Sequence, residues 1–189
     1  MGNKGVQTKK EICLKAYELF ASKGFQKVTM QDVCNVTGLS RGGLYRHFSN
    51  TSQIFEEIFL TLSGNSNSFF QDEMAKGRSS LEIWDEVKQK LQGEMLDSRN
   101  SLSLAIYEYS NLVDKTFFVE LNKKGQKNWS AFFDYGIKRG EIGEFDVQQV
   151  VDLIAYSYQG IRMWGRVIPL SEQEVNHIID SWETMIFKK

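Results

Sequence analysis

The sequence predicts an all-α protein, with an N-terminal three-helix domain that holds a helix-turn-helix and a larger C-terminal helical domain, about nine helices in all. Apolar residues recur at every third or fourth position along nearly the whole chain, and no alternating pattern typical of strands competes with them. Only 1 of the 189 residues is proline, so long helices are not interrupted.

Charge divides the chain into two parts. Residues 1–50 carry 8 Lys or Arg against 3 Asp or Glu, whereas residues 51–189 carry 15 against 21. We therefore expect a basic domain over residues 1–50 and an acidic domain over residues 51–189. The basic excess of the first domain favours a polyanionic partner.

Several classes of protein are excluded by composition. The longest stretch without a charged residue, residues 58–71, is shorter than a bilayer-spanning helix, and no apolar run of signal-peptide type occurs at the N-terminus. We expect a cytoplasmic protein without a membrane partner. Two Cys and two distant His form no metal-ligand pattern, and no phosphate-binding glycine loop occurs, so we expect no catalytic residue, no metal, no cofactor and no enzyme activity.

The first two helices have clear boundaries in the sequence. A helix over residues 8–23 should stop at Gly24. Thr29 should cap a second, short helix, with Asp32 three positions later completing a capping box. Gly38 should end this helix by adopting the left-handed conformation.

A helix-turn-helix is predicted over residues 29–48. A third short helix from about Ser40 would bury Leu44 and Phe48 and point its polar residues outward. The same pattern would also fit a plain αα-hairpin with a solvated basic face. The outward set is rich in hydrogen-bond donors and contains two glycines that permit close approach to a nucleic-acid groove: Ser40, Arg41, Gly42, Gly43, Tyr45, Arg46 and His47.

The remainder of the chain continues the helical period. Asn50 or Thr51 should cap a fourth helix that runs through Leu62, and three further helices should follow beyond Gly77. Asp146 should open a helix whose middle, residues 150–163, is apolar on most of its circumference, so this helix has two surfaces to bury. A narrow polar stripe interrupts it at Asp152, Gln159 and Arg162, and Ser171 should cap the last helix.

Residues 8–59 resemble the DNA-binding domain of the tetracycline-repressor (TetR) family of bacterial transcription regulators. The segment from Lys138 to Ile142, followed by Asp146, also resembles the family where its penultimate helix begins. The residues that carry the N-terminal resemblance are Thr29, Gly38, Leu39, Ser40, Gly42, Leu44, Tyr45, His47, Phe48 and Ile54.

The resemblance implies roles in DNA binding. Ser40 and Arg41 match the positions where the recognition helix enters the major groove, and the Arg41 guanidinium suits two parallel hydrogen bonds to guanine. Tyr45 and His47 match phosphate-contacting positions. The remaining candidates are Thr29 as a cap that offers amides to a phosphate, Gly42 and Gly43 as bare backbone, Arg46 as a DNA contact or a solvated cation, and Thr51, where the family commonly has Lys.

The resemblance also implies a homodimer on a palindromic DNA operator. Small and apolar residues of the last two helices are expected at the dimer interface, although they would also suit packing within one subunit: Ala155, Gly160, Gly165, Ile178 and Trp182.

A small-molecule effector that releases the operator is the family's usual regulator. We expect a hydrophobic effector, and the pocket candidates are Trp84, Tyr107, Trp129, Phe133, Tyr156 and Met163, which are also ordinary core residue types. Glu108 and Glu120 would suit a cationic effector if they were buried. The sequence thus predicts a DNA-binding transcriptional regulator, and specifically a repressor. The alternative is a helical structural or adaptor protein that does not bind DNA.

Overall fold

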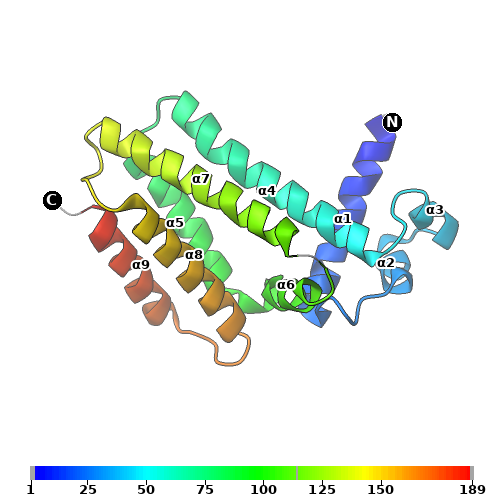
Figure 1. Cartoon of the computed structure of the whole chain (residues 1–189). Helices are drawn as coiled ribbons and strands as arrows, with labels where there is room; N and C mark the ends of the chain where they lie inside the picture. The colour runs from blue at the N-terminus through cyan, green and yellow to red at the C-terminus, as the bar shows by residue number, and fades with distance from the viewer. Residues whose placement is uncertain (1–2, 114, 188–189) are drawn as a thin grey trace. The chain divides into compact units, whose positions relative to one another are not determined.

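A computed structural model describes residues 3–113 and 115–187, and every regular element in these ranges is helical (Figure 1). The predicted all-α class is therefore confirmed. The elements are α1 (Asn3–Lys23), α2 (Met30–Thr37), α3 (Arg41–Tyr45), α4 (Thr51–Ala75), α5 (Ser80–Leu96), a 3₁₀ turn (Ser98–Asn100), α6 (Ser103–Ser110), α7 (Thr116–Lys138), α8 (Val147–Trp164) and α9 (Glu172–Ile186).

The chain forms two compact units. Unit 1 comprises Met1–Gly64 and Asn100–Asp114, and unit 2 comprises Asn65–Arg99 and Lys115–Lys189. The chain thus leaves unit 1 along α4, returns to it for α6 and leaves it again. The predicted functional division after residue 50 stays a prediction. No helix in the described parts of the chain is both long and apolar enough to cross a membrane.

Unit 1 is built around an aromatic cluster that joins α1, α4 and α6. The rings of Phe20 and Phe55 lie 4.8 Å apart, and Tyr109 of α6 contacts both Phe25 at 4.6 Å and Phe55 at 5.0 Å. Aromatic pairs at these separations add to the stabilisation from burial. Helix α6 is therefore part of the core that supports the N-terminal helices.

Polar contacts tie α6 to unit 1 as well. The Tyr109 hydroxyl donates to Glu56 Oε1 at 2.5 Å, and burial together with this bond raises the pKa of Tyr109 to about 12. Glu108 accepts a hydrogen bond from the backbone N–H of Gln26 at 2.9 Å. Its half-buried carboxylate thus holds the α1–α2 turn, whereas Glu120 is exposed and pairs with Lys123.

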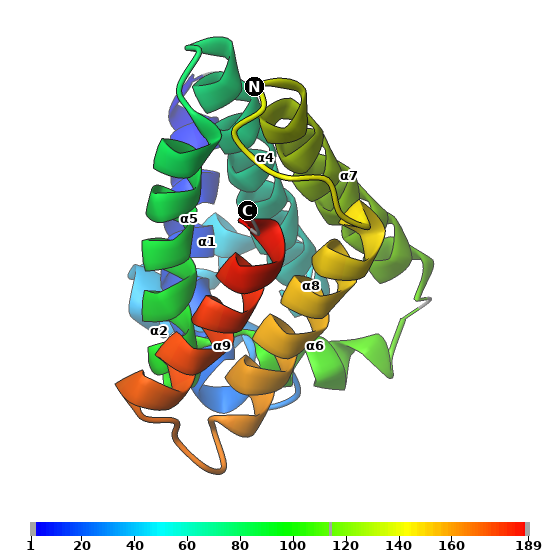
Figure 2. The ribbon, with the colours of Figure 1, turned by 90° about the vertical axis from the view of Figure 1, so that its left-hand side faces the viewer.

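Unit 2 is a bundle of α5, α7, α8, α9 and the last turns of α4, and α9 lies between α5 and α8 (Figure 2). Its core is continuous across all these helices, with Trp84, Phe132, Phe133 and Trp182 among its largest buried side chains. Burial of these side chains is the main favourable contribution to folding of this unit.

Helix α4 is longer than the apolar run that predicted it. It continues from Leu62 to Ala75 through a segment of small polar residues. Phe70, near its end, packs on the rings of Trp129 and Phe132 at 5.1 and 5.0 Å. Tertiary packing of the last turns thus sustains a helix that local propensity alone favours weakly.

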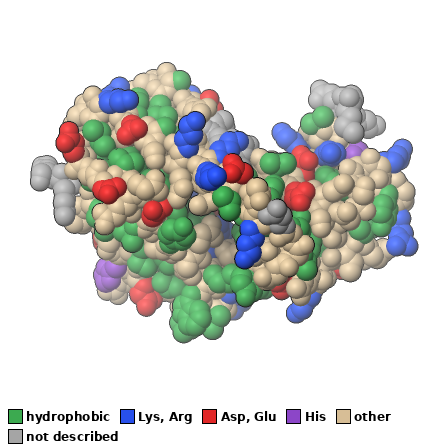
Figure 3. Space-filling model, viewed as in Figure 1, with side chains coloured by type: hydrophobic (Ala, Val, Ile, Leu, Met, Phe, Trp, Pro, Cys, Tyr) green, Lys and Arg blue, Asp and Glu red, His purple; other side chains and the backbone are tan. Residues whose placement is uncertain are grey.

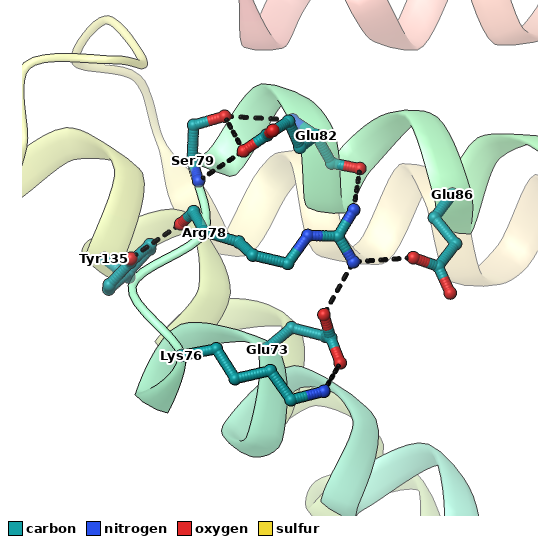
Figure 4. Close-up of polar contacts among 7 residues, drawn as sticks. All are labelled: Glu73, Lys76, Arg78, Ser79, Glu82, Glu86 and Tyr135. Carbon is teal, nitrogen blue, oxygen red and sulfur yellow. Dashed lines mark hydrogen bonds and ion pairs between the residues drawn. The ribbon is translucent and has the colours of Figure 1, made fainter.

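A buried carboxylate joins α4 to α5 (Figure 4). Glu73 is 8% exposed and accepts hydrogen bonds from Lys76 Nζ and Arg78 Nη1, each at 2.6 Å. Arg78 Nη1 also donates to Glu86 at 2.8 Å, and the Arg78 carbonyl accepts from the Tyr135 hydroxyl at 2.7 Å. The bonds from Lys76 and Arg78 lower the pKa of Glu73, so it is ionised at neutral pH.

The Glu73 cluster predicts a pH-dependent stability difference. A carboxyl whose folded-state pKa is depressed stabilises the fold fully above its ordinary pKa of 4.5, and this stabilisation is lost as the pH falls through the folded-state value. We expect Glu73→Gln to lower the Tm at pH 7 and the difference from the parent protein to shrink below about pH 4.5.

Glu86→Gln is the matched control, because Glu86 bonds the same guanidinium but its side chain is 53% exposed. It should lower the Tm less than Glu73→Gln at pH 7. Thermal unfolding followed by circular dichroism at several pH values measures both, and equal effects of the two changes would contradict the assignment.

Candidate nucleic-acid interface

Helix α2 begins at the predicted capping box. The Thr29 hydroxyl accepts from the Asp32 N–H at 3.1 Å, and Asp32 Oδ2 accepts from the Thr29 N–H at 2.9 Å. Lys23 Nζ lies 2.9 Å from Asp32 Oδ1. The hydrogen bonds from Thr29 and Lys23 lower the pKa of Asp32 far below its ordinary range. Thr29 is confirmed as a cap, and its phosphate contact stays a prediction.

The turn between α2 and α3 depends on Gly38. Its φ is +73°, which is the left-handed region, and its N–H donates to the Cys34 carbonyl at 2.9 Å. Ser40 then caps α3 by accepting from the Gly43 N–H at 3.1 Å. Both features match the predicted helix-turn-helix. Glycine is favoured at position 38 because a residue with a side chain would be strained in the left-handed conformation.

Helix α3 is anchored from one side. Leu44 is completely buried, and Phe48, just beyond the helix, is 2% exposed. Lys9 Nζ of α1 lies 4.9 Å from the centre of the Phe48 ring. These contacts fix which side of the short helix faces the core of unit 1, and therefore which side faces solvent.

The free side of α3 presents most of the predicted DNA-binding set. Ser40, Arg41, Gly42 and Arg46 are exposed, and Tyr45 is 47% exposed, whereas Gly43 and His47 are half-buried. A Cβ at Gly42 would meet nothing within 4 Å, so the backbone there is open to a ligand. Lys and Arg side chains lie around this part of the surface in the space-filling view (Figure 3).

Two neighbouring positions refine the sequence-based set. Thr51 is half-buried in the first turn of α4, and Asn50 caps that helix by accepting from the Gln53 N–H at 2.9 Å. Lys9, which lies over the Phe48 ring, was not among the residues predicted from the sequence to lie at this site. Only the general basic excess of the N-terminal region hints at it, because its position beside Phe48 depends on how α1 packs.

The site offers hydrogen-bond donors and cations but no catalytic chemistry. Within the described residues, no group of three or more His, Cys, Asp or Glu side chains is placed to hold a metal ion. Burial raises the pKa of the Cys13 thiol to about 11, so this cysteine is a poor nucleophile at neutral pH. Exposed guanidinium and hydroxyl groups on α3, with the half-buried His47 imidazole just beyond it, suit the base edges and phosphates of duplex DNA.

A family model described as "Bacterial regulatory proteins, tetR family" matches residues 12–58, which include the whole helix-turn-helix. Residues 12–58 therefore form a domain of the TetR type. The family is one of transcriptional regulators, so this protein is a DNA-binding regulator and not an enzyme.

Relatives of this protein are regulators too. The HTH-type transcriptional repressor KstR2 of Rhodococcus jostii is 28% identical over 139 residues, which cover 70% of this chain and 67% of that protein. The uncharacterized HTH-type transcriptional regulator YfiR of Bacillus subtilis is 45% identical over 51 residues, which cover 27% of this chain and 25% of that protein.

Solved structures share the fold across both units. A TetR-family transcriptional regulator from Agrobacterium tumefaciens superposes with a TM-score of 0.76 at 13% identity, covering 96% of this chain and 99% of that chain. E. coli NemR in its reduced form superposes with a TM-score of 0.77 at 9% identity, covering 97% of this chain and all of that chain.

The six predicted effector-binding residues do not lie together. Tyr107 belongs to unit 1 and is 62% exposed, and Tyr156 of α8 is 68% exposed. Trp84, Trp129 and Phe133 pack in the core of unit 2, where the Trp129 ring lies 6.3 Å from Trp84 and 5.8 Å from Phe133. Met163 is half-buried on α8. Their role in binding stays a prediction.

The five predicted dimer residues also separate. Gly160 is exposed, and Ala155 and Ile178 are half-buried, so these three reach the surface of the protomer. Trp182 is only 2% exposed because it packs in the core of its own unit. Gly165 is buried, and a Cβ there would lie 2.9 Å from Ser98 Oγ, so its small size serves packing within the chain.

The two glycines of the helix-turn-helix should respond oppositely to alanine. Gly38→Ala forces a side chain into the left-handed region and should destabilise the protein by about 1–2 kcal/mol. Gly42→Ala meets open space in a helix and should stabilise it by up to about 1 kcal/mol. Urea denaturation measures both changes. A stabilising Gly38→Ala would contradict the role of the turn.

Proposed function

We propose that this protein is a transcriptional repressor that binds a palindromic operator as a homodimer and is released by a small hydrophobic effector. The observation that carries the proposal is the orientation of α3. This short helix follows the turn at Gly38, is anchored by the buried Leu44, and presents Arg41 and Tyr45 to solvent. The KstR2 relative of Rhodococcus jostii is itself named a repressor, which supports repression over activation.

We assign recognition of the DNA bases to Arg41. Its guanidinium lies in the first turn of α3, is exposed, and is suited to two parallel bonds to the O6 and N7 atoms of guanine. Tyr45, Arg46 and His47 follow on the same helix and at its end, where they suit phosphates. The glycines at 42 and 43 bring the backbone close to the groove but read few base edges.

Selection of bound duplexes from random DNA with the purified full-length protein tests the operator. We expect a palindromic consensus, because one short recognition helix contacts too few base pairs for useful specificity. Arg41→Ala should then weaken binding to the selected duplex by a factor of at least about ten at fixed salt.

Lys90→Gln is the charge-matched control, because it removes one exposed cation from α5 in unit 2. It should leave the affinity for the selected duplex unchanged in fluorescence anisotropy. Failure to enrich any duplex, even at low salt, would reject the regulator and favour the helical adaptor.

The homodimer is assigned to the outer face of α8. Leu153, Tyr156, Gly160 and Trp164 are all exposed and follow one another at intervals of three or four residues, so they form one stripe along the helix. Val167 and Ile168 extend it and are 67% and 56% exposed. A continuous apolar stripe of this kind favours burial against a second copy.

Trp164→Glu tests this surface, because a charge would have to be desolvated in the dimer. We expect the variant to sediment as a monomer at micromolar concentration while its circular dichroism spectrum is unchanged. Leu81→Glu changes another exposed apolar residue, which is 50% exposed on α5, and should remain dimeric. A dimeric Trp164→Glu protein would place the interface elsewhere.

Effector release requires that the effector bind the DNA-incompetent state more tightly than the DNA-bound state. The aromatic core around Trp84, Trp129 and Phe133 supplies apolar walls for such a molecule in unit 2. Tyr156 is better assigned to the dimer stripe than to this core, because its side chain is on the outside of α8.

A further inference from the structure

The polar stripe of α8 contains one residue whose hydrogen bonding is incomplete. Asp152 is satisfied, since its Oδ1 accepts from Gln126 Nε2 at 2.8 Å and from Gln148 Nε2 at 3.0 Å. Arg162, almost three turns later, is half-buried, and its Nε is a buried nitrogen with no partner among the described residues. A buried donor without a partner is costly, so it calls for an explanation.

The carboxylate linked to Arg162, that of Glu94, reaches it only through the Tyr158 hydroxyl. Arg162 Nη1 donates to the Tyr158 hydroxyl at 2.6 Å, and that hydroxyl in turn donates to Glu94 of α5. The guanidinium carbon lies 5.1 Å from the centre of the Tyr158 ring. Glu94 therefore faces the guanidinium across a hydroxyl group instead of contacting it.

Two other arginines of unit 2 show the usual arrangement. Arg78 contacts Glu73 and Glu86 at 2.6 and 2.8 Å, and Arg139 contacts Glu141 at 2.7 Å. Arg162 takes part in none of the ion pairs found among the described residues. A half-buried guanidinium that lacks a direct carboxylate is well suited to receive an anion from outside the protein.

The geometry of the guanidinium defines the class of anion. Its Nη1 is occupied by Tyr158, and the opposite edge carries the Nε–H and one Nη2–H, which point in parallel. Such an edge matches two oxygens of one carboxylate or phosphate group. Arg166, two residues beyond the end of α8, is a second cation in this part of unit 2 and donates to the Arg99 carbonyl at 3.0 Å.

The same stretches of α5 and α8 also carry apolar residues. Leu91 and Met95 flank Glu94 along α5 and belong to or pack on the core of unit 2, and Met163 follows Arg162 on α8. We expect the rest of a molecule held at Arg162 by an oxyanion to contact apolar side chains of these two helices.

We propose that the effector is an amphipathic acid whose carboxylate or phosphate group binds the Nε–Nη2 edge of Arg162. This inference rests on the proposed function, since it names the chemical class of the effector. It assigns Arg162 as the recognition residue and Tyr158 as the positioning residue that orients the guanidinium.

Isothermal titration of the full-length protein, without DNA, with four matched eight-carbon probes tests the proposal. These are octanoate, octyl phosphate, octan-1-ol and octylammonium. We expect octanoate or octyl phosphate to bind at least about tenfold more tightly than octan-1-ol, and octylammonium to bind most weakly. The tighter of the two acids identifies the preferred oxyanion.

Arg162→Met should abolish the preference for the acids, and Lys90→Gln should retain it, because it removes one positive charge from an exposed position of α5. If Arg162→Met does not fold, Arg162→Lys gives the test, since lysine keeps the charge but lacks the parallel pair of donors. It should reduce the preference several-fold.

The proposal is overturned if none of the four probes binds, if octan-1-ol binds as tightly as the acids, or if the folded Arg162 variants keep the preference. The DNA affinity of the same preparations is measured separately. Loss of acid recognition with intact operator binding would reject the effector class alone, whereas absence of operator binding would reject the proposed function and leave acid binding to be judged from the titrations.

Discussion

The left-handed backbone at Gly38 is the constraint on which the presentation of α3 depends. It reverses the chain within a few residues, and the buried Leu44 and Phe48 then hold the next helix against the rest of unit 1. Every proposed base or phosphate contact from Ser40 to His47 takes its direction from this arrangement. The capping box at Thr29 and Asp32 fixes the start of the preceding helix in the same way. Local backbone chemistry thus determines where the binding groups point.

Such local features are also what the sequence could predict. Gly24, Gly38, Ser40 and Ser171 mark helix ends by chemistry that acts within a few residues, and all four mark the ends observed. The alternation of buried Leu44 and Phe48 with exposed polar residues is likewise visible in the sequence, so the candidate interface was largely predictable.

Features that depend on distant contacts were not predictable. Helix α4 continues to Ala75 because Phe70 packs on α7, which lies some sixty residues further on. The exposure of Tyr156 and the burial of Trp182 depend on which side of α8 and α9 faces the core. An apolar residue at helical spacing fits either side, so periodicity alone cannot assign it to the interior, a ligand or a partner. The incomplete bonding of Arg162 depends on α5 and is invisible in the sequence for the same reason.

The return of the chain into unit 1 at α6 has a consequence for protein engineering. A fragment that ended at residue 64 would lack Tyr109, which packs on Phe55. It would also lack Glu108, which accepts a hydrogen bond from the N–H of Gln26. Such a fragment would expose aromatic surface and aggregate more readily. Chimaeras with other regulators should therefore carry α6 along with the N-terminal segment.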